Sequence, residues 1–133
     1  VMTLATLTGC GSDTKTLSCT KDSSDKGLTN EDKVVYEFKE NRITKATQTA
    51  SIIVEGEYEQ YKSDYKNSAQ QAVEGYNKLG GFSAKVEENN NKITVIVEMN
   101  PKDMSESDYT LYNMGESYES MNEMLINKGY TCK

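Results

Sequence analysis

The residues best suited to covalent chemistry are three cysteines, at positions 10, 19 and 132. Cys10 ends the run Leu7-Thr8-Gly9-Cys10, which has the form of a bacterial lipobox: an aliphatic residue, two small residues and the cysteine that becomes acylated. Residues 1–6 are apolar or small, as at the end of the hydrophobic part of a signal peptide. We therefore expect cleavage before Cys10, lipidation of its sulfur, and a charged region ahead of residue 1.

This signal divides the chain into three predicted parts. Residues 1–9 are the end of a lipoprotein signal peptide, residues 10–16 are the lipidated cysteine and a short polar tether, and residues 17–133 are a single domain. Stable anchoring needs more than one acyl chain, which lipoprotein processing supplies. We expect a lipid-anchored protein on the extracytoplasmic face of the cell membrane.

Once Cys10 is assigned to lipid, Cys19 and Cys132 remain as an even pair near the two ends of the predicted domain. In an extracytoplasmic chain such a pair favours a structural disulfide. Two free thiols or a redox-active pair are the alternatives, although neither cysteine lies in a Cys-X-X-Cys motif.

Several kinds of chemistry are disfavoured by composition. The chain has no histidine, so it lacks the usual base of a nucleophilic triad and the commonest metal ligand. Its net charge of −6, without a run of lysine or arginine, argues against nucleic acid as a partner. We expect no cofactor and no metal.

Carboxylates are the remaining candidates for catalysis. Paired acids occur at Glu55 and Glu57, at Glu87 and Glu88, and in a cluster formed by Asp103, Glu106 and Asp108. With 21 acidic residues in the chain, we expect these pairs to be solvated surface groups rather than an acid–base pair. The cluster lacks the glycine and the spacing of a calcium loop, and Ser105 followed by Asp108 is better read as a helix cap.

The pattern of apolar residues predicts the elements that position these groups. Period-two alternation predicts strands over 17–21, 34–38, 42–54, 82–86 and 93–99, with a loop over 22–32 and turns at 40–41 and 89–91. Helical spacing predicts helices over 56–79 and from 105 to about 125, the second with a break near Gly115. The order β-β-β-α-β-β-α predicts an α+β, two-layer sandwich whose helices pack on one face of a mainly antiparallel sheet.

The first predicted helix carries an unusual stripe of tyrosines. Tyr58, Tyr61 and Tyr65 begin a series with helical spacing, which continues through Ala69, Ala72, Tyr76 and Leu79. Tyrosine has a rigid apolar ring and a hydroxyl, so the first three residues could line a groove for a sugar, a peptide or a lipid. The alternative is that the stripe is the buried face of the helix. Met114, Met121 and Met124 are likewise expected to fill the core rather than to bind a soft metal.

Several of these segments together resemble the YehR-like bacterial lipoproteins. They are the Leu-Thr-Gly-Cys lipobox, the segment Leu17-Ser18-Cys19-Thr20, a hairpin followed by a helix, and the terminal Gly129-Tyr130-Thr131-Cys132-Lys133. The resemblance implies a small α+β envelope protein of unknown function, with Cys10 lipidated and Cys19 bonded to Cys132. It supplies no catalytic residue to carry over.

These observations lead to two functional hypotheses. The first is a non-enzymatic, membrane-anchored binding or interaction module in the cell envelope, whose partner is an envelope protein or a small ligand. The second is a carboxylate-dependent enzyme acting on cell-wall or glycan material.

Overall fold

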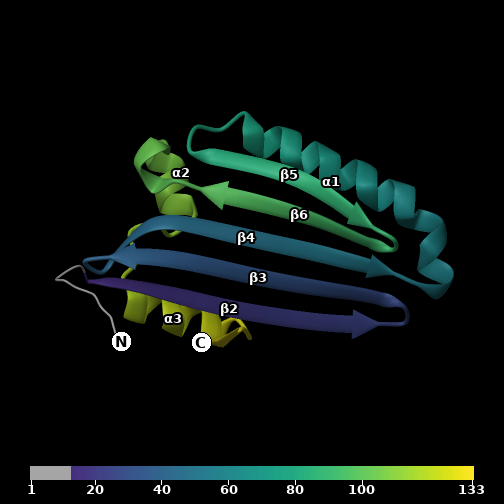
Figure 1. The fold of residues 1–133 in the computed structure, drawn as a ribbon, viewed down its shortest axis with the longest axis horizontal. Helices are drawn as coiled ribbons and strands as arrows, with labels where there is room; N and C mark the ends of the chain where they lie inside the picture. Colours follow the sequence, from purple (N-terminus) through teal and green to yellow (C-terminus); the bar gives the residue numbers. More distant parts are fainter. Residues whose placement is uncertain (1–12) are drawn as a thin grey trace, which may run out of the picture.

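The computed structural model describes residues 13–133, so the predicted signal peptide, Cys10 and the start of the tether lie outside the described residues. Within this range, six strands form one antiparallel sheet in the order β5-β6-β4-β3-β2-β7 (Figure 1). The strands are β2 (Thr14–Asp25), β3 (Leu28–Lys39), β4 (Arg42–Val54), β5 (Phe82–Asn89), β6 (Lys92–Met99) and β7 (Thr131–Cys132).

The helices lie between β4 and β5 and after β6. The first group is a 3₁₀ turn, η1 (Gly56–Tyr61), that runs into α1 (Lys62–Asn77); the second is η2 (Pro101–Asp103), α2 (Glu106–Leu111) and α3 (Tyr118–Asn127). The predicted break near Gly115 is confirmed, and so is the cap, because the Ser105 hydroxyl accepts a hydrogen bond from the Asp108 amide. The α+β class and the predicted element order are confirmed, with β7 as an addition.

The predicted loop over 22–32 is wrong, because most of it belongs to strands. β2 and β3 pair without interruption from Thr14–Lys39 to Asp25–Leu28, and only Lys26 and Gly27 form the turn, with φ of 50° and 94°. The side chains at this end are mostly polar and exposed, so they lack the apolar alternation that marks a strand. β2 also begins at Thr14, so residues 14–16, which the sequence assigned to the tether, are part of the sheet.

A bulge in β4 changes which residues face the core. Tyr36 pairs with Ala46 but Phe38 pairs with Ile43, so β4 has one residue more than β3 between these pairs. The hydroxyl of Thr44 donates to the carbonyl of Glu37 at 3.1 Å, and Thr44 is exposed. The predicted core face of this strand therefore contains Ile43 in place of Thr44.

The core lies on one face of the sheet, beneath the helices. Leu17 and Cys19 of β2 and Phe38 of β3 are almost fully buried there, together with Met114 and Met121 from the C-terminal helical region. The cluster is completed by Val34, Ile43, Ala46, Phe82, Val97, Met99 and Leu125. The expectation that methionines fill the core is confirmed for Met114 and Met121, whereas Met124 is only half-buried.

Helix α1 covers β5 and β6 without a fully buried residue of its own. Its last residue, Asn77, bonds both backbone groups of Ala84 on β5, donating from Nδ2 at 3.0 Å and accepting at Oδ1 at 2.7 Å. Since β5 is an edge strand, these two bonds occupy backbone groups that no strand pairs. At the other end of α1, Lys62 and Lys66 bond the Glu88 carboxylate at 3.0 and 2.9 Å.

The chain ends with a disulfide between its last strand and its first. Cys19 and Cys132 are directly opposite in the β2–β7 pair, with Cα atoms 4.0 Å apart and sulfurs 1.99 Å apart. The backbone groups of Ser18 and Lys133 exchange two further hydrogen bonds. The C-terminal segment is thereby fixed along the outer edge of β2.

We predict a large loss of stability when this bridge is removed. The bond closes a loop with a sequence separation of 113 residues, for which the chain-entropy relation gives about 4–5 kcal/mol. The double variant Cys19→Ala/Cys132→Ala should lose most of this in urea unfolding.

Wild-type protein in reductant should show the same loss, and the double variant should not respond to reductant. Equal unfolding midpoints for oxidised and reduced wild-type protein would contradict the prediction.

Candidate functional site

The structure separates the residues that the sequence singled out. Cys10 lies outside the described residues, whereas Cys19 and Cys132 are bonded to each other. Tyr58, Tyr61 and Tyr65 lie on η1 and α1, where Tyr61 is 47% exposed and the other two are half-buried. None of the three lines the cavities described below. The prediction that they form a groove therefore has no cavity among these to support it.

The alternative, that the tyrosine stripe is a core face, is confirmed at one position. Tyr76 packs against the core cluster, and its ring stacks on Phe82 with 5.7 Å between centroids. Toward the start of α1 the tyrosine side chains of the stripe are more exposed. This end of the helix lies beside the polar end of β5, at Glu88.

Three other tyrosines do come together, in a cavity of about 150 Å³ on the helix-covered face. We call it the tyrosine pocket. Tyr36 comes from the middle of β3, Tyr112 from the end of α2, and Tyr130 from the residue before β7. Its remaining lining residues are Val34, Ala46, Thr47, Gln48, Met99, Leu125 and Lys128. The pocket thus has an apolar floor, three phenol side chains and one side-chain amide.

The environment shifts the pKa of all three phenols in the same direction, upward. Burial raises the pKa of Tyr36, and the neighbouring Tyr130 adds to the effect. Burial also raises the pKa of Tyr112, with a further contribution from Tyr76. For Tyr130, burial again acts first and the Asp32 carboxylate second. As an ordinary phenol is protonated at neutral pH and these shifts are upward, each hydroxyl can both donate and accept a hydrogen bond.

Lys21 holds the C-terminal side of the pocket in place. Its ammonium donates a 2.7 Å hydrogen bond to the carbonyl of Lys128 and lies 5.7 Å from the ring centroid of Tyr130. Both contacts join β2 to the segment after α3. Asp32, beside this group, has a raised pKa because burial outweighs the attraction of Lys21.

Sequence reasoning missed this pocket, although it placed its residues on the correct elements. Tyr36 lies between Val34 and Phe38 in the predicted strand 34–38, so alternation does put it on the core face. Tyr112 and Tyr130 belong to the second helical region and the terminal motif. These three segments meet only through long-range packing, for which the sequence contains no local signal.

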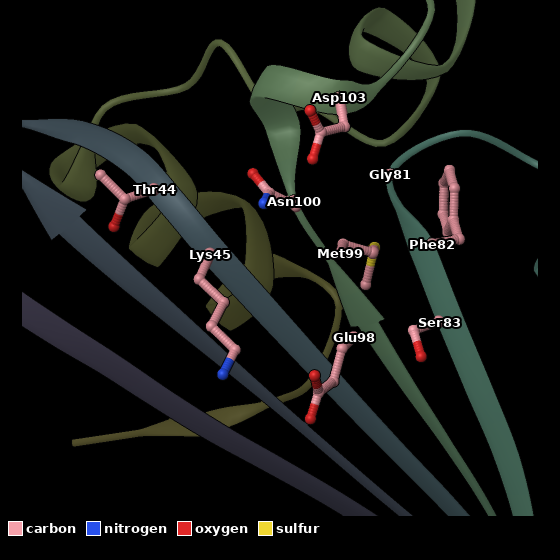
Figure 2. Close-up of a pocket in the computed structure, with 9 residues that line it drawn as sticks. All are labelled: Thr44, Lys45, Gly81, Phe82, Ser83, Glu98, Met99, Asn100 and Asp103. Carbon is pink, nitrogen blue, oxygen red and sulfur yellow. The ribbon is translucent and has the colours of Figure 1, made fainter.

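A second, wider depression of about 380 Å³ lies at the end of the sheet where β4 bulges (Figure 2). Lys45 and Glu98 extend toward one end of it and Asp103 lies at the other. All three charged side chains are exposed, so water screens them strongly. Gly81, with φ of 86°, brings the chain so close to Asn100 that a Cβ atom would lie 2.8 Å from its carbonyl oxygen. This close packing accounts for the glycine without a ligand.

The predicted carboxylate groups occupy the surface. Glu88 is held by Lys62 and Lys66, and Glu87 pairs with Lys85 at 3.3 Å. Glu55, Glu57, Asp103 and Glu106 are exposed, and the Asp108 amide completes the cap of α2. Within residues 13–133, no group of three or more acidic or cysteine side chains is arranged to hold a metal ion. No helix in this part of the chain combines the length and apolarity needed to cross a membrane.

We predict that the Glu88 ion pairs stabilise the fold only above mildly acidic pH. Lys66 and Lys62 lower the pKa of Glu88 from 4.5 to about 2, so the stabilisation is complete above pH 4.5 and disappears as the pH falls toward 2. Glu88→Gln should remove this part of the pH dependence of the unfolding free energy.

The double variant Lys62→Met/Lys66→Met should give the same flattened profile between pH 4.5 and 2, because it removes the same pairs. A Glu88→Gln curve parallel to that of the wild type over this range would show that the pairs do not contribute.

We also predict that Tyr76 and Tyr61 differ in their effect on stability. Tyr76→Ala should cost roughly 1–3 kcal/mol in urea unfolding because it removes a ring that packs on the core, whereas Tyr61→Ala should change stability by less than about 0.5 kcal/mol. Similar losses of unfolding free energy at both positions would contradict this difference and indicate one continuous core face along α1.

Comparisons with known proteins support the fold and not a family. No family model and no curated protein match the chain. The structure is similar to the NMR structure of a protein from Streptococcus pneumoniae TIGR4, with a TM-score of 0.65 and 10% sequence identity. The match covers 98% of this chain and 91% of the other. The likeness shows that this arrangement of sheet and helices occurs in a second protein, and the resemblance to YehR-like lipoproteins stays a prediction.

Proposed function

We propose that this protein is a lipid-anchored, extracytoplasmic binding module of the cell envelope, and that the tyrosine pocket is where it binds. The anchor is supported by the lipobox that ends at Cys10. Export is supported by the disulfide between Cys19 and Cys132, because such bonds persist in oxidising compartments. The YehR-like resemblance points in the same direction.

The observation that carries the binding role is the tyrosine pocket itself. The pocket opens to solvent, since its three tyrosines are half-buried and Lys128 is exposed, while Ala46, Met99 and Leu125 in its lining are buried. Here a 150 Å³ cavity lies between the sheet, the end of α2 and the segment after α3, with Tyr36, Tyr112 and Tyr130 in its walls. An apolar cavity with a few convergent polar groups is the usual form of a ligand site.

The start of β2 suggests how such a module would sit on a membrane. Four Cα steps separate Cys10 from Thr14, which allows at most about 14 Å of extended chain. The amide of Glu40, in the β3–β4 turn, bonds the carbonyl of Asp13 at 2.8 Å. An anchor on Cys10 would therefore keep the β3–β4 turn near the lipid surface, whereas the β2–β3 turn lies at the far end of these strands (Figure 1).

We predict that Cys10→Ser releases the protein from the membrane fraction of cells that export it, since it removes the acylated sulfur. The disulfide and the thermal midpoint of the released domain should stay unchanged, because position 10 is neither part of the Cys19–Cys132 bond nor among the core residues of the described domain. Retention of the variant in washed membranes would contradict a lipid anchor.

The binding role is tested by a photo-crosslinking residue placed in the anchored protein in living cells. At position 128, whose side chain lines the pocket, the probe should capture a molecule from the envelope, detected by mass spectrometry. The matched control is position 123, which is exposed on α3, the helix that ends just before position 128, and does not line the pocket. Equal capture at both positions, or capture at neither, would contradict binding at the tyrosine pocket.

A further inference from the structure

We infer that the tyrosine pocket binds a single uncharged sugar ring, such as one residue of an envelope glycan. This inference rests on the proposed binding role and adds the chemical class of the ligand. It is carried by four properties of the pocket: its polar groups, its charge, its backbone and its size.

The polar groups of the pocket suit a ring that carries hydroxyls. Tyr36, Tyr112 and Tyr130 each offer a flat apolar ring and a hydroxyl, and Gln48 adds an amide that both donates and accepts. One face of a sugar ring is apolar enough to pack on a phenol, and its hydroxyls need such two-way partners around the rim. The hydroxyl of Tyr112 has Tyr76 as a hydrogen-bonding neighbour. An apolar ligand would displace water from Gln48 and the other two hydroxyls without replacing its hydrogen bonds, which costs free energy.

The charges in and around the pocket disfavour an ionic ligand. Its lining contains no carboxylate, and the nearby Asp32 is offset by Lys21. Phenol rings can attract a cation, but Lys21 already lies 5.7 Å from the ring centroid of Tyr130, and Lys128 adds a second positive charge. Its one cation, Lys128, has an exposed side chain and stands at the edge. Charged groups bind well in protein sites when a fixed opposite charge meets them, and the interior of this pocket has none. A neutral ligand is therefore favoured.

The backbone beneath the pocket argues against an extended peptide. Strands β3 and β4 lie inside the sheet, and Tyr36 pairs with Leu17 on one side and Ala46 on the other. Ala46 in turn pairs with Met99. A peptide that binds as an added strand needs a free edge, and these two strands offer none.

The size of the pocket sets the length of what it holds. Its volume of about 150 Å³ is well below the roughly 300–1,000 Å³ of sites that enclose drug-sized ligands. One six-membered ring is the natural unit for such a space. A longer glycan would place one residue in the pocket and leave its neighbours in solvent.

The experiment is an NMR titration of isotope-labelled, disulfide-bonded protein with methyl glycosides of glucose, galactose and N-acetylglucosamine, with sodium acetate and lysine as ionic controls. At least one glycoside should give saturable shifts of the Gln48 side-chain amide and of the Tyr112 and Tyr130 backbone amides. Gln48→Leu and Tyr130→Phe should each weaken binding about threefold to tenfold, because each removes one hydrogen-bonding group while keeping most of the bulk.

Gln71→Leu is the matched control, since Gln71 is exposed on α1 and does not line the pocket. Its affinity should equal that of the wild type, and the thermal midpoints of all variants should be measured beside it. If Gln48→Leu does not fold, Tyr130→Phe still tests the inference.

Absence of saturable shifts with every glycoside, shifts that map away from the pocket, or unchanged affinity in the folded pocket variants would each overturn the inference. These failures differ from failure of the proposed binding role. Capture at position 128 in cells together with no glycoside binding would leave the role standing and reject only the sugar. Glycoside binding in vitro together with no capture in cells would show that the pocket can hold a sugar and reject the proposed binding role in the envelope.

Discussion

The covalent bond between Cys19 and Cys132 determines more of this structure than its position at the chain end suggests. It holds β7 on the outer edge of β2, and β7 has only two residues with which to pair. The residues just before it, Lys128 and Tyr130, form one side of the tyrosine pocket, and Lys21 of β2 contacts both. Local pairing of two residues is too weak to fix such a segment, so the shape of the pocket depends on the bridge.

The second constraint is that, among residues 13–133, the helices all cover the same face of the sheet. The helices supply few large aliphatic side chains, and the buried cluster draws on Met99, Met114 and Met121 as well as on Phe38 and Phe82. Tyrosines complete the margin of this cluster, with rings against the core and hydroxyls toward its rim. A core built in this way places phenol hydroxyls in the walls of the tyrosine pocket, above its apolar floor. The tyrosines that pack on the core cluster therefore also supply the hydroxyls of the pocket.

How far the sequence predicts the structure depends on the range of the interactions involved. Positions governed by local backbone preference were predictable: Glu40 and Asn41 adopt positive φ in the β3–β4 turn, and Gly129 ends α3. The extension of β2 and β3 to the Lys26–Gly27 turn was not, because its exposed polar side chains leave no apolar period. The bulge at Thr44 could not be predicted either. One extra residue moves the side chains on one side of it to the opposite face of the sheet, and the composition of the strand gives no sign of this. The tyrosine pocket depends on contacts between three distant segments, for which a single sequence contains no periodic signal.

The two bonds from Asn77 to Ala84 have a consequence for neighbouring copies of the protein. A membrane anchor, as proposed above, would confine copies to a plane, where their sheets meet at high local concentration and in similar orientation. Two sheets join most readily through free backbone groups at their edges. On the β5 side Asn77 occupies one such pair of groups, and on the β2 side β7 occupies another. Edge pairing is therefore interrupted near the start of β5 and near the middle of β2, which limits any edge-to-edge contact to a few residues and favours separate molecules in a crowded layer.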